Sequence, residues 1–344
     1  MWHHGPMTQP PPTSRRRKLF MAAAVVGVAV ILLELITWPM APKRMDAQAD
    51  QARHTETAMR GSELLGWELV PGPSHAFGVK RPTTINALGT RNPQLGPKRT
   101  GTLRMITLGD SSVYGVMVED ADVFSAVAAR DLQHALGQPV EAINAGVPGY
   151  SSEQARRLYT HRLADLQPDI VVIATLWSDS QPGPAPDAIR FGSEGNALLT
   201  VLRWSNTYRL LEGLLLGWQP AEQVGWMLSE SAQGRRVPLP AYAENLDTLA
   251  GLARQAGALP VFLMLPSDRD LGPTALEAPR PAYRTAMRDA AQRARAPLVE
   301  TPPHFAKLGA EHFFDDVHPT PKGHAIIGRL LAQAVTVRMN TDKR

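Results

Sequence analysis

The chain has 344 residues, of which 44% are hydrophobic and 20% charged, a composition typical of globular proteins. Its net charge of +4 is small and no basic stripe with interleaved aromatic residues is present, which argues against a nucleic-acid partner. The absence of cysteine excludes disulfides, thiolate nucleophiles, cysteine-ligated metals and a lipoprotein anchor.

An apolar segment lies near the N-terminus. Residues 19–40 contain a single charged residue, Glu34, and about 20 apolar residues suffice for a helix to cross a bilayer. Residues 15–18 are Arg-Arg-Arg-Lys, and basic residues beside a membrane helix stay cytoplasmic. We therefore expect a cytoplasmic tail at residues 1–18, an uncleaved signal-anchor helix, and the C-terminal bulk in the periplasm or outside the cell. A cleaved signal peptide is the alternative, although its small-x-small site at residues 47–49 would lie beyond three charged residues.

The next segment, residues 41–100, is polar at first and then rich in glycine and proline. Charged and polar residues predominate up to residue 62, which is typical of a stalk. Glycine and proline recur through residues 63–100, which predicts a loop-rich lead-in rather than regular elements.

From residue 101, short β-prone runs alternate with amphipathic segments. In chain order we expect a strand at 103–108, a helix at 122–136 capped by Asp122, a strand at 140–144, a helix ending at 166, a strand at 170–176, a helix at 241–256, a strand at 261–265, a helix ending at 295, a strand at 298–300 and a helix beginning at Pro321 after Thr320. This alternation predicts an α/β fold, a parallel sheet in a three-layer α/β/α domain spanning residues 101–338.

Residues 180–240 interrupt the alternation. Apolar residues there recur at helical spacing, as at Val201, Trp204, Tyr208, Leu211, Leu215 and Trp218. We interpret this stretch as an inserted helical segment that packs on the domain; the alternative is a cap over the site that receives an acyl group or touches the membrane.

Four polar or glycine-rich segments fall at the carboxyl ends of the expected strands, where open parallel sheets bind ligands. They are Gly-Asp-Ser at 109–111, Ala-Gly-Val-Pro-Gly at 145–149, Trp-Ser-Asp at 177–179 and Phe-Asp-Asp-Val-His at 314–318. A serine hydroxyl becomes a good nucleophile when a base takes its proton and a third group orients that base. One rim of the sheet thus supplies a candidate for each role.

These segments resemble those of the SGNH/GDSL hydrolase family: TLGDSSVYG at 107–115, INAGVPGYSS at 143–152 and DDVHPT at 315–320. The resemblance covers about residues 101–336, and the apolar N-terminal segment is similar to that of membrane-anchored bacterial members. It implies a flavodoxin-like sheet.

The resemblance also implies roles for individual residues. Ser111 would be the nucleophile, His318 the general base and then acid, and Asp315 the residue that orients the imidazole; Asp316 is the alternative orienter. The backbone N–H groups of Ser111 and Gly146 would stabilise the oxyanion.

One segment departs from the family pattern. Ser178 stands where the family has an asparagine side chain that donates to the oxyanion, and its hydroxyl is a shorter donor. Supporting roles are expected for Asp110, Asn144 and Asp179. His324 is interpreted as a residue on the surface of the last helix.

The expected function is therefore a serine esterase or lipase that cleaves acyl esters through an acyl-serine intermediate, without metal or organic cofactor. Its substrate would be a lipid or an acylated glycan. Two alternatives stay open: an O-acyltransferase or deacetylase that acts on an envelope polysaccharide, and a catalytically impaired binding module, which the missing asparagine favours.

Overall fold

The computed structural model describes residues 15–40, 58–62, 64–183, 186–191, 202, 205–216, 234–272 and 280–342. The contacts within the chain divide it into two compact units. The helical unit comprises residues 1–44 and 193–218, and the α/β unit comprises residues 45–192 and 219–344.

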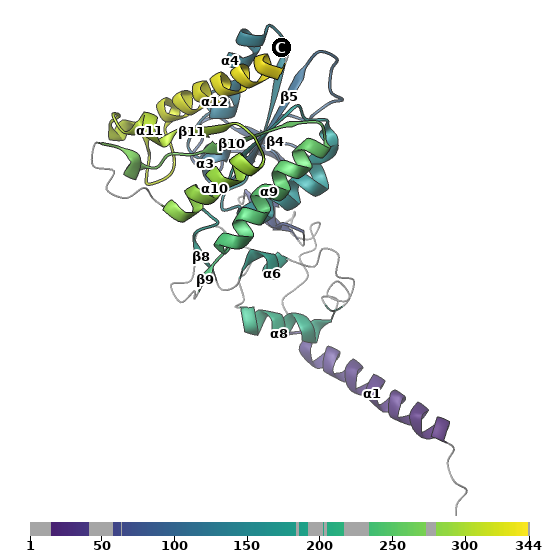
Figure 1. The fold of residues 1–344 in the computed structure, drawn as a ribbon. Helices are drawn as coiled ribbons and strands as arrows, with labels where there is room; N and C mark the ends of the chain where they lie inside the picture. The colour runs from purple at the N-terminus through teal and green to yellow at the C-terminus, as the bar shows by residue number, and fades with distance from the viewer. Residues whose placement is uncertain are drawn as a thin grey trace, which may run out of the picture. The chain divides into compact units, whose positions relative to one another are not determined.

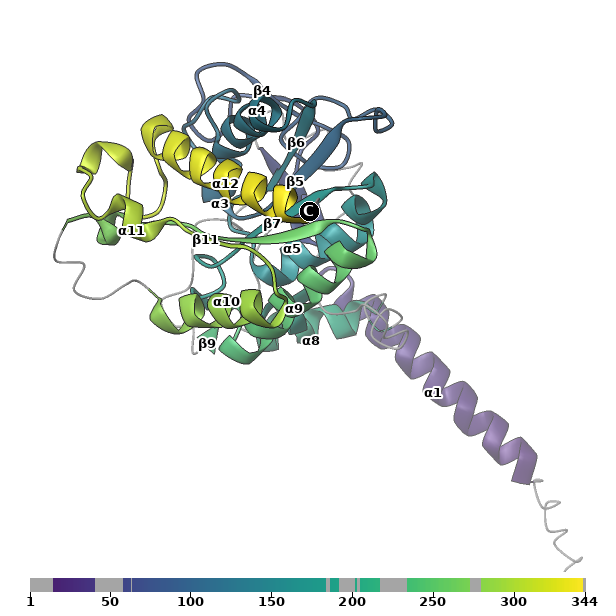
Figure 2. The same ribbon diagram turned by 45° about the horizontal axis from the view of Figure 1, so that its top comes forward.

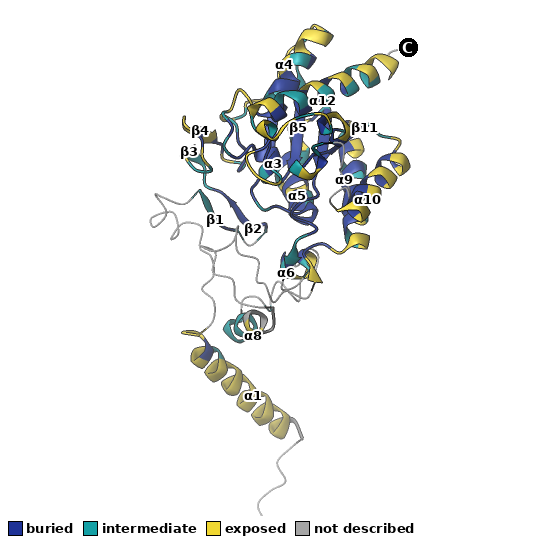
Figure 3. Ribbon diagram, turned by 90° about the vertical axis from the view of Figure 1, so that its left-hand side faces the viewer, coloured by how far each residue is buried: buried dark blue, intermediate teal, exposed yellow. Residues whose placement is uncertain are grey.

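The helical unit contains helices α1 (Arg15–Thr37) and α8 (Asn206–Leu216). Residues 17–37 of α1 are long and apolar enough to cross a membrane, and this apolar stretch is exposed (Figure 3). The carboxylate of Glu34 accepts hydrogen bonds from the backbone N–H groups of Asn206 (2.6 Å) and Thr207 (3.3 Å). The one charge in the apolar run thus satisfies N–H groups that would be unpaired at the start of α8.

The α/β unit is built on a five-stranded sheet (Figure 1). Its order is β11 (Leu298–Glu300), β10 (Leu259–Met264), β7 (Ile170–Ala174), β5 (Leu103–Gly109) and β6 (Val140–Gly146). All four neighbouring pairs are parallel. Numbered along the chain, this is the flavodoxin-like order 2-1-3-4-5. The central strand β7 is buried along its whole length, as its uninterrupted apolar sequence predicts.

Helices cover both faces of this sheet (Figures 1 and 2). Helices α4 (Phe124–Leu136) and α12 (Pro321–Asp342) pack together on one face. The other face carries α5 (Ser152–Leu158), α9 (Leu239–Gln255) and α10 (Pro281–Arg293). The predicted three-layer α/β/α fold is therefore confirmed.

Shorter elements connect these layers. They are α3 (Ser111–Tyr114), a π-helical turn (Tyr159–Leu163) and a 3-10 turn (Ala164–Leu166) after α5, β8 (Pro182–Gly183) paired with β9 (Gly234–Arg235), α6 (Asp187–Phe191), and α11 (Pro302–Phe305). Further 3-10 turns span Asp268–Asp270 and Ala310–His312.

The lead-in before residue 101 is more structured than the sequence suggested. It forms two antiparallel hairpins, β1 (Met59–Ser62) with β2 (Gly66–Leu69) and β3 (Gly72–Ser74) with β4 (Thr83–Ile85). Trp67 is buried and its indole N–H donates to the Pro148 carbonyl (3.0 Å). The buried guanidinium of Arg91 donates to the carbonyls of Tyr114 and Gly115, both at 2.8 Å. These strands are too short to carry a clear pattern, and long-range contacts decide their conformation. Of the predicted stalk at residues 41–62, residues 41–57 lie outside the described residues, and residues 59–62 form strand β1.

The start of α4 differs from the prediction. Val123, not Asp122, is the N-cap residue, and it forms no side-chain capping bond. Instead, the backbone N–H of Phe124 donates to Nδ1 of His324 (3.0 Å). His324 was expected on the surface of α12, but it is fully buried. Burial, together with the charges of Arg91 and His318, lowers the pKa of His324 to about 3, which keeps the ring a neutral acceptor.

The interruption at residues 180–240 does contain helical structure, in α6 and α8. Leu211 of α8 is exposed. Val201, Trp204 and Trp218 of the expected apolar stripe lie outside the described residues, so the proposed packing of that stripe stays a prediction.

Candidate active site

Ser111 begins a tight strand-to-helix connection, the serine turn, at the carboxyl end of β5. Gly109 ends the strand, and a β-carbon there would lie 2.5 Å from the Ala174 carbonyl oxygen, so only glycine fits. Asp110 is the N-cap of α3 and accepts a hydrogen bond from the Ser112 N–H (3.0 Å). This local structure places Ser111 at the first position of α3, at the rim of the sheet.

His318 approaches Ser111 from a loop 207 residues later in the chain, here the histidine loop (residues 314–319). Its Nε2 lies 2.7 Å from Ser111 Oγ, and its Nδ1 lies 2.7 Å from Asp315 Oδ2. The other Asp315 oxygen accepts from the backbone N–H groups of Val317 (3.0 Å) and His318 (2.9 Å). The carboxylate is thus held on both oxygens while it orients the imidazole.

The electrostatics of this loop favour an ionised Asp315. Partial burial raises the pKa of its carboxyl, but the hydrogen bonds from the His318 ring and from the backbone of Val317 and His318 outweigh burial, leaving the pKa below its usual range. No hydrogen bond joins Asp316 to the imidazole in the described part of the chain. The arrangement can therefore move a proton from the serine hydroxyl to a histidine that an ionised carboxylate orients.

Gly146 does not present a free N–H group to this site. Its N–H donates to the side-chain oxygen of Asn144 (3.0 Å), and a β-carbon at Gly146 would lie 2.6 Å from the Val113 carbonyl carbon. The expectation that Gly146 donates to an oxyanion is therefore wrong, because this N–H already donates to the Asn144 side chain in the same strand.

A second glycine in the same segment has a different environment. Gly149 lies in the loop after β6 with φ +80° and is partly exposed. Its N–H donates to none of the described residues, and neither does that of Ser111. Sequence reasoning missed Gly149; the signal was that the motif at residues 145–149 contains two glycines, only one of which ends a strand.

Asp110 is buried at the serine turn, and burial raises its pKa against the opposing effect of the hydrogen bond from the Ser112 N–H. Its second carboxylate oxygen has no hydrogen-bond partner among the described residues. Ser178 is itself buried in the turn after β7, and its hydroxyl forms no hydrogen bond with the described residues. The Asn144 amide joins the end of β6 to the serine turn, because it donates to the carbonyls of Val113 (3.0 Å) and Tyr114 (3.2 Å) in α3.

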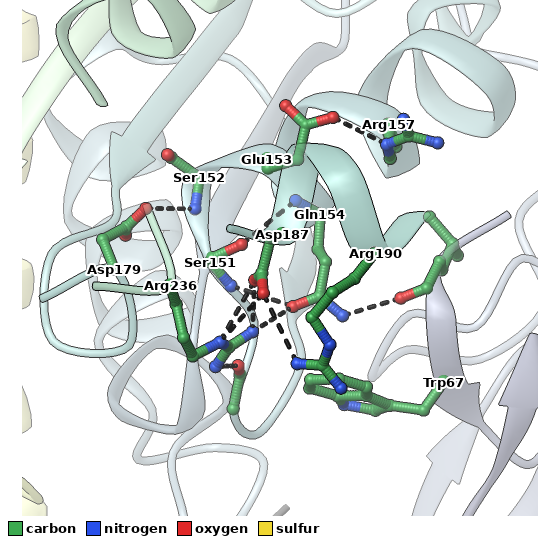
Figure 4. A network of polar contacts seen from close by, with 12 residues as sticks. Trp67, Ser151, Ser152, Glu153, Gln154, Arg157, Asp179, Asp187, Arg190 and Arg236 are labelled. Carbon is green, nitrogen blue, oxygen red and sulfur yellow. Dashed lines mark hydrogen bonds and ion pairs between the residues drawn. The ribbon is translucent and has the colours of Figure 1, made fainter. Parts of the chain in front are cut away.

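Asp179 holds the start of α5 in a buried polar network (Figure 4). One carboxylate oxygen accepts from the Ser152 N–H (2.7 Å), and the other has no hydrogen-bond partner. Nearby, Arg236 pairs with Asp187 (2.6 Å) and donates to the Gln154 side chain (2.7 Å). Burial raises the pKa of Asp179 from 3.8 to about 7 despite the bonds from Ser152. The network ties the second and third segments together at a cost in charge desolvation.

Among the described residues, no group of three or more histidine, aspartate or glutamate side chains is arranged to hold a metal ion.

Comparison with known proteins gives a sequence-family match and structural matches. The profile of the GDSL-like lipase/acylhydrolase family matches residues 107–326. No curated protein sequence matches the chain.

Solved structures with similar folds include a lipase/acylhydrolase from Enterococcus faecalis (16% identity over 69% of this chain and 96% of that one, TM-score 0.43). A psychrotrophic esterase from Pseudoalteromonas is similar at 15% identity, 69% and 98% coverage, and a TM-score of 0.44. A GDSL-like lipase from Bacteroides thetaiotaomicron is similar at 16% identity, 71% and 93% coverage, and a TM-score of 0.40.

The raised pKa of Asp179 predicts a pH-dependent effect of its removal. The unfolded chain ionises this group near pH 3.8 and the folded chain only near pH 7, so the folded state loses stability as pH rises between these values. Asp179→Asn stays neutral and keeps an oxygen for the Ser152 N–H. The thermal midpoint of this variant minus that of wild type should be larger at pH 8.5 than at pH 4.5. The increase should be at least about 2–4 °C, which corresponds to roughly 1 kcal/mol of unfolding free energy in a domain of this size.

The control is Asp289→Asn, which changes an exposed carboxylate on α10. Its difference from wild type should be the same at both pH values. A difference for Asp179→Asn that is equally independent of pH would contradict the assignment.

Proposed function

This chain belongs to the GDSL-like lipase/acylhydrolase family and is an ester-cleaving hydrolase, and we propose that it works through an acyl-serine intermediate on Ser111. The observation that carries the proposal is the hydrogen-bonded series Ser111–His318–Asp315, with both links at 2.7 Å. Such a series is what nucleophilic catalysis by a serine hydroxyl requires.

In the proposed mechanism, Ser111 Oγ attacks the ester carbonyl carbon while His318 Nε2 takes the hydroxyl proton. Asp315 holds Nδ1–H and stabilises the imidazolium that forms. When the tetrahedral intermediate collapses, His318 gives the proton to the leaving alcohol oxygen, and the acyl group stays on Ser111. A water molecule then repeats the sequence and releases the acid.

We assign the oxyanion donors from the free N–H groups. The backbone N–H groups of Ser111 and Gly149 are two donors that no described residue occupies. Ser178 Oγ is the third, directly or through a water molecule. Backbone donors of this kind need no reorganisation during the reaction, which is the source of their effect.

The nucleophile is tested by covalent labelling. Full-length wild-type protein in detergent should react with a fluorophosphonate probe and hydrolyse p-nitrophenyl acetate. Ser111→Ala should abolish labelling and lower kcat on the order of a thousandfold or more. Ser112→Ala is the matched control, because the Ser112 hydroxyl donates to the Val317 carbonyl (2.9 Å), and this variant should still be labelled. Labelling that survives Ser111→Ala but is lost in Ser112→Ala would overturn the assignment.

The third oxyanion donor is tested by kinetics. Ser178→Ala should lower kcat by roughly ten- to a thousandfold with little change in KM, because the interaction strengthens in the transition state. Ser178→Asn should keep or raise kcat. Ser180→Ala is the control from the same turn; its hydroxyl donates to the Trp177 carbonyl (3.1 Å), and kcat should change less than twofold. Equal rates for Ser178→Ala and wild type would show that the hydroxyl plays no part.

For the location, we propose that α1 is an uncleaved membrane anchor with residues 1–18 in the cytoplasm and the α/β unit in the periplasm or outside the cell. The basic cluster at residues 15–18 and the apolar helix that follows support this orientation. Lipids and acylated envelope glycans, the ester substrates proposed here, are both within reach of such an anchored domain.

The orientation is tested with an alkaline phosphatase reporter fused after Arg344, which is active only when exported. We expect an active reporter that sediments with membranes. Replacing residues 15–18 with glutamine should reduce that activity. An inactive reporter would refute the orientation, and a soluble mature form beginning near residue 42 or 50 would establish a cleaved signal peptide.

A further inference from the structure

A pocket of about 430 Å³ opens beside the histidine loop in the α/β unit. Asp316 and Val317, the two residues that precede the histidine, line it, and so does Trp177, which precedes the serine of the third segment. The carbonyl of Val317 accepts the hydrogen bond from the Ser112 hydroxyl. The pocket therefore lies beside the loop that carries His318.

Three arginines from separate elements line this pocket: Arg235 in β9, Arg269 in the 3-10 turn after β10, and Arg280 immediately before α10. All three side chains are exposed, and none forms an ion pair with a carboxylate of the described residues. Partial burial and the charges of Arg235 and Arg269 lower the pKa of Arg280. Like charges thus repel one another across the pocket, and an anion placed between them would relieve that repulsion.

Two carboxylates, those of Asp268 and Asp316, also line the pocket. Asp316 is in the histidine loop, and the backbone N–H of Asp268 donates to the Asp316 carbonyl (2.9 Å). Burial and the charges of Asp316 and Asp315 raise the pKa of Asp268, and the neighbouring Arg269 opposes them. Acidic and guanidinium groups therefore line the same pocket. Two carboxylates do not balance three guanidinium groups.

We propose that this pocket binds a carboxylate or phosphate carried by the alcohol part of the ester, so that the preferred substrates are acyl esters of acidic alcohols. This inference rests on the proposed role of Ser111. The alcohol part is assigned because His318 protonates the leaving oxygen, which must therefore lie on the histidine side, where the pocket opens. Guanidinium groups match the planar or tetrahedral oxygens of both anions.

A matched pair of acetyl esters tests the preference. p-Acetoxybenzoate carries a carboxylate on its alcohol part, and its methyl ester is neutral. In full-length protein, Arg235→Gln, Arg269→Gln and Arg280→Gln should each lower the ratio of kcat/KM for the anionic over the neutral ester by about two- to fivefold, the range for one exposed charge pair. Arg329→Gln, an exposed residue of α12, should leave the ratio unchanged. Added salt should slow hydrolysis of the anionic ester only.

Direct binding separates this proposal from the proposed catalytic role. Ser111→Ala protein is titrated by calorimetry with galacturonate and with glycerol 3-phosphate. Binding of either anion that weakens when Arg280 is also changed to glutamine supports the pocket, and the tighter ligand shows whether a sugar acid or a phosphate headgroup is recognised. The pocket proposal is overturned if neither anion binds. It is also overturned if the ratio of kcat/KM for the anionic over the neutral ester is the same in wild type and in all three arginine variants. Loss of all ester turnover in wild type with intact anion binding would instead refute the role of Ser111.

Discussion

The close approach of three backbones at the carboxyl end of the sheet is the constraint on which the site depends. No β-carbon fits at Gly109, which lies against the Ala174 carbonyl, or at Gly146, which lies against α3. Because these segments touch without intervening side chains, α3 begins directly at the strand end, and Ser111 projects at a fixed position toward the histidine loop. A larger residue at either glycine would move the nucleophile away from an imidazole with which it shares a 2.7 Å contact.

Buried carboxylates hold this geometry at the expense of stability. Asp110 and Asp179 are both fully or almost fully buried, and burial raises the pKa of each. One oxygen of each accepts a hydrogen bond from a backbone N–H group. Asp110 holds the serine turn through the Ser112 N–H, and Asp179 joins the third segment to the start of α5 through the Ser152 N–H. The family's hydrolytic chemistry requires rigid loops, and desolvated charge is a physical means of obtaining them.

The same principle operates in the helical unit, where the one acidic residue of the apolar segment caps α8. A carboxylate in an apolar helix is costly unless it is paired, and the start of a helix offers unpaired N–H donors. In the arginine-lined pocket, by contrast, three guanidinium groups form no ion pair with a carboxylate of the described residues, which suits them to a ligand that brings the opposite charge.

Local patterns in the sequence were sufficient for the parallel α/β sheet, its helical layers and the hydrolase family, because strand and helix periodicity and the motif around Ser111 each lie within a few residues. They also singled out Asp315 and His318, which the fold brings next to the serine. Tertiary contacts alone decided the rest. The N–H of Gly146 is occupied by the side chain of Asn144, two residues before it, and hydrogen bonds to the carbonyls of Val113 and Tyr114 hold that side chain in place. His324 is a buried acceptor because α4, which precedes it by 200 residues, begins against it. The contacts that fix Asn144 and cover His324 join residues far apart in the chain, and no local pattern records them.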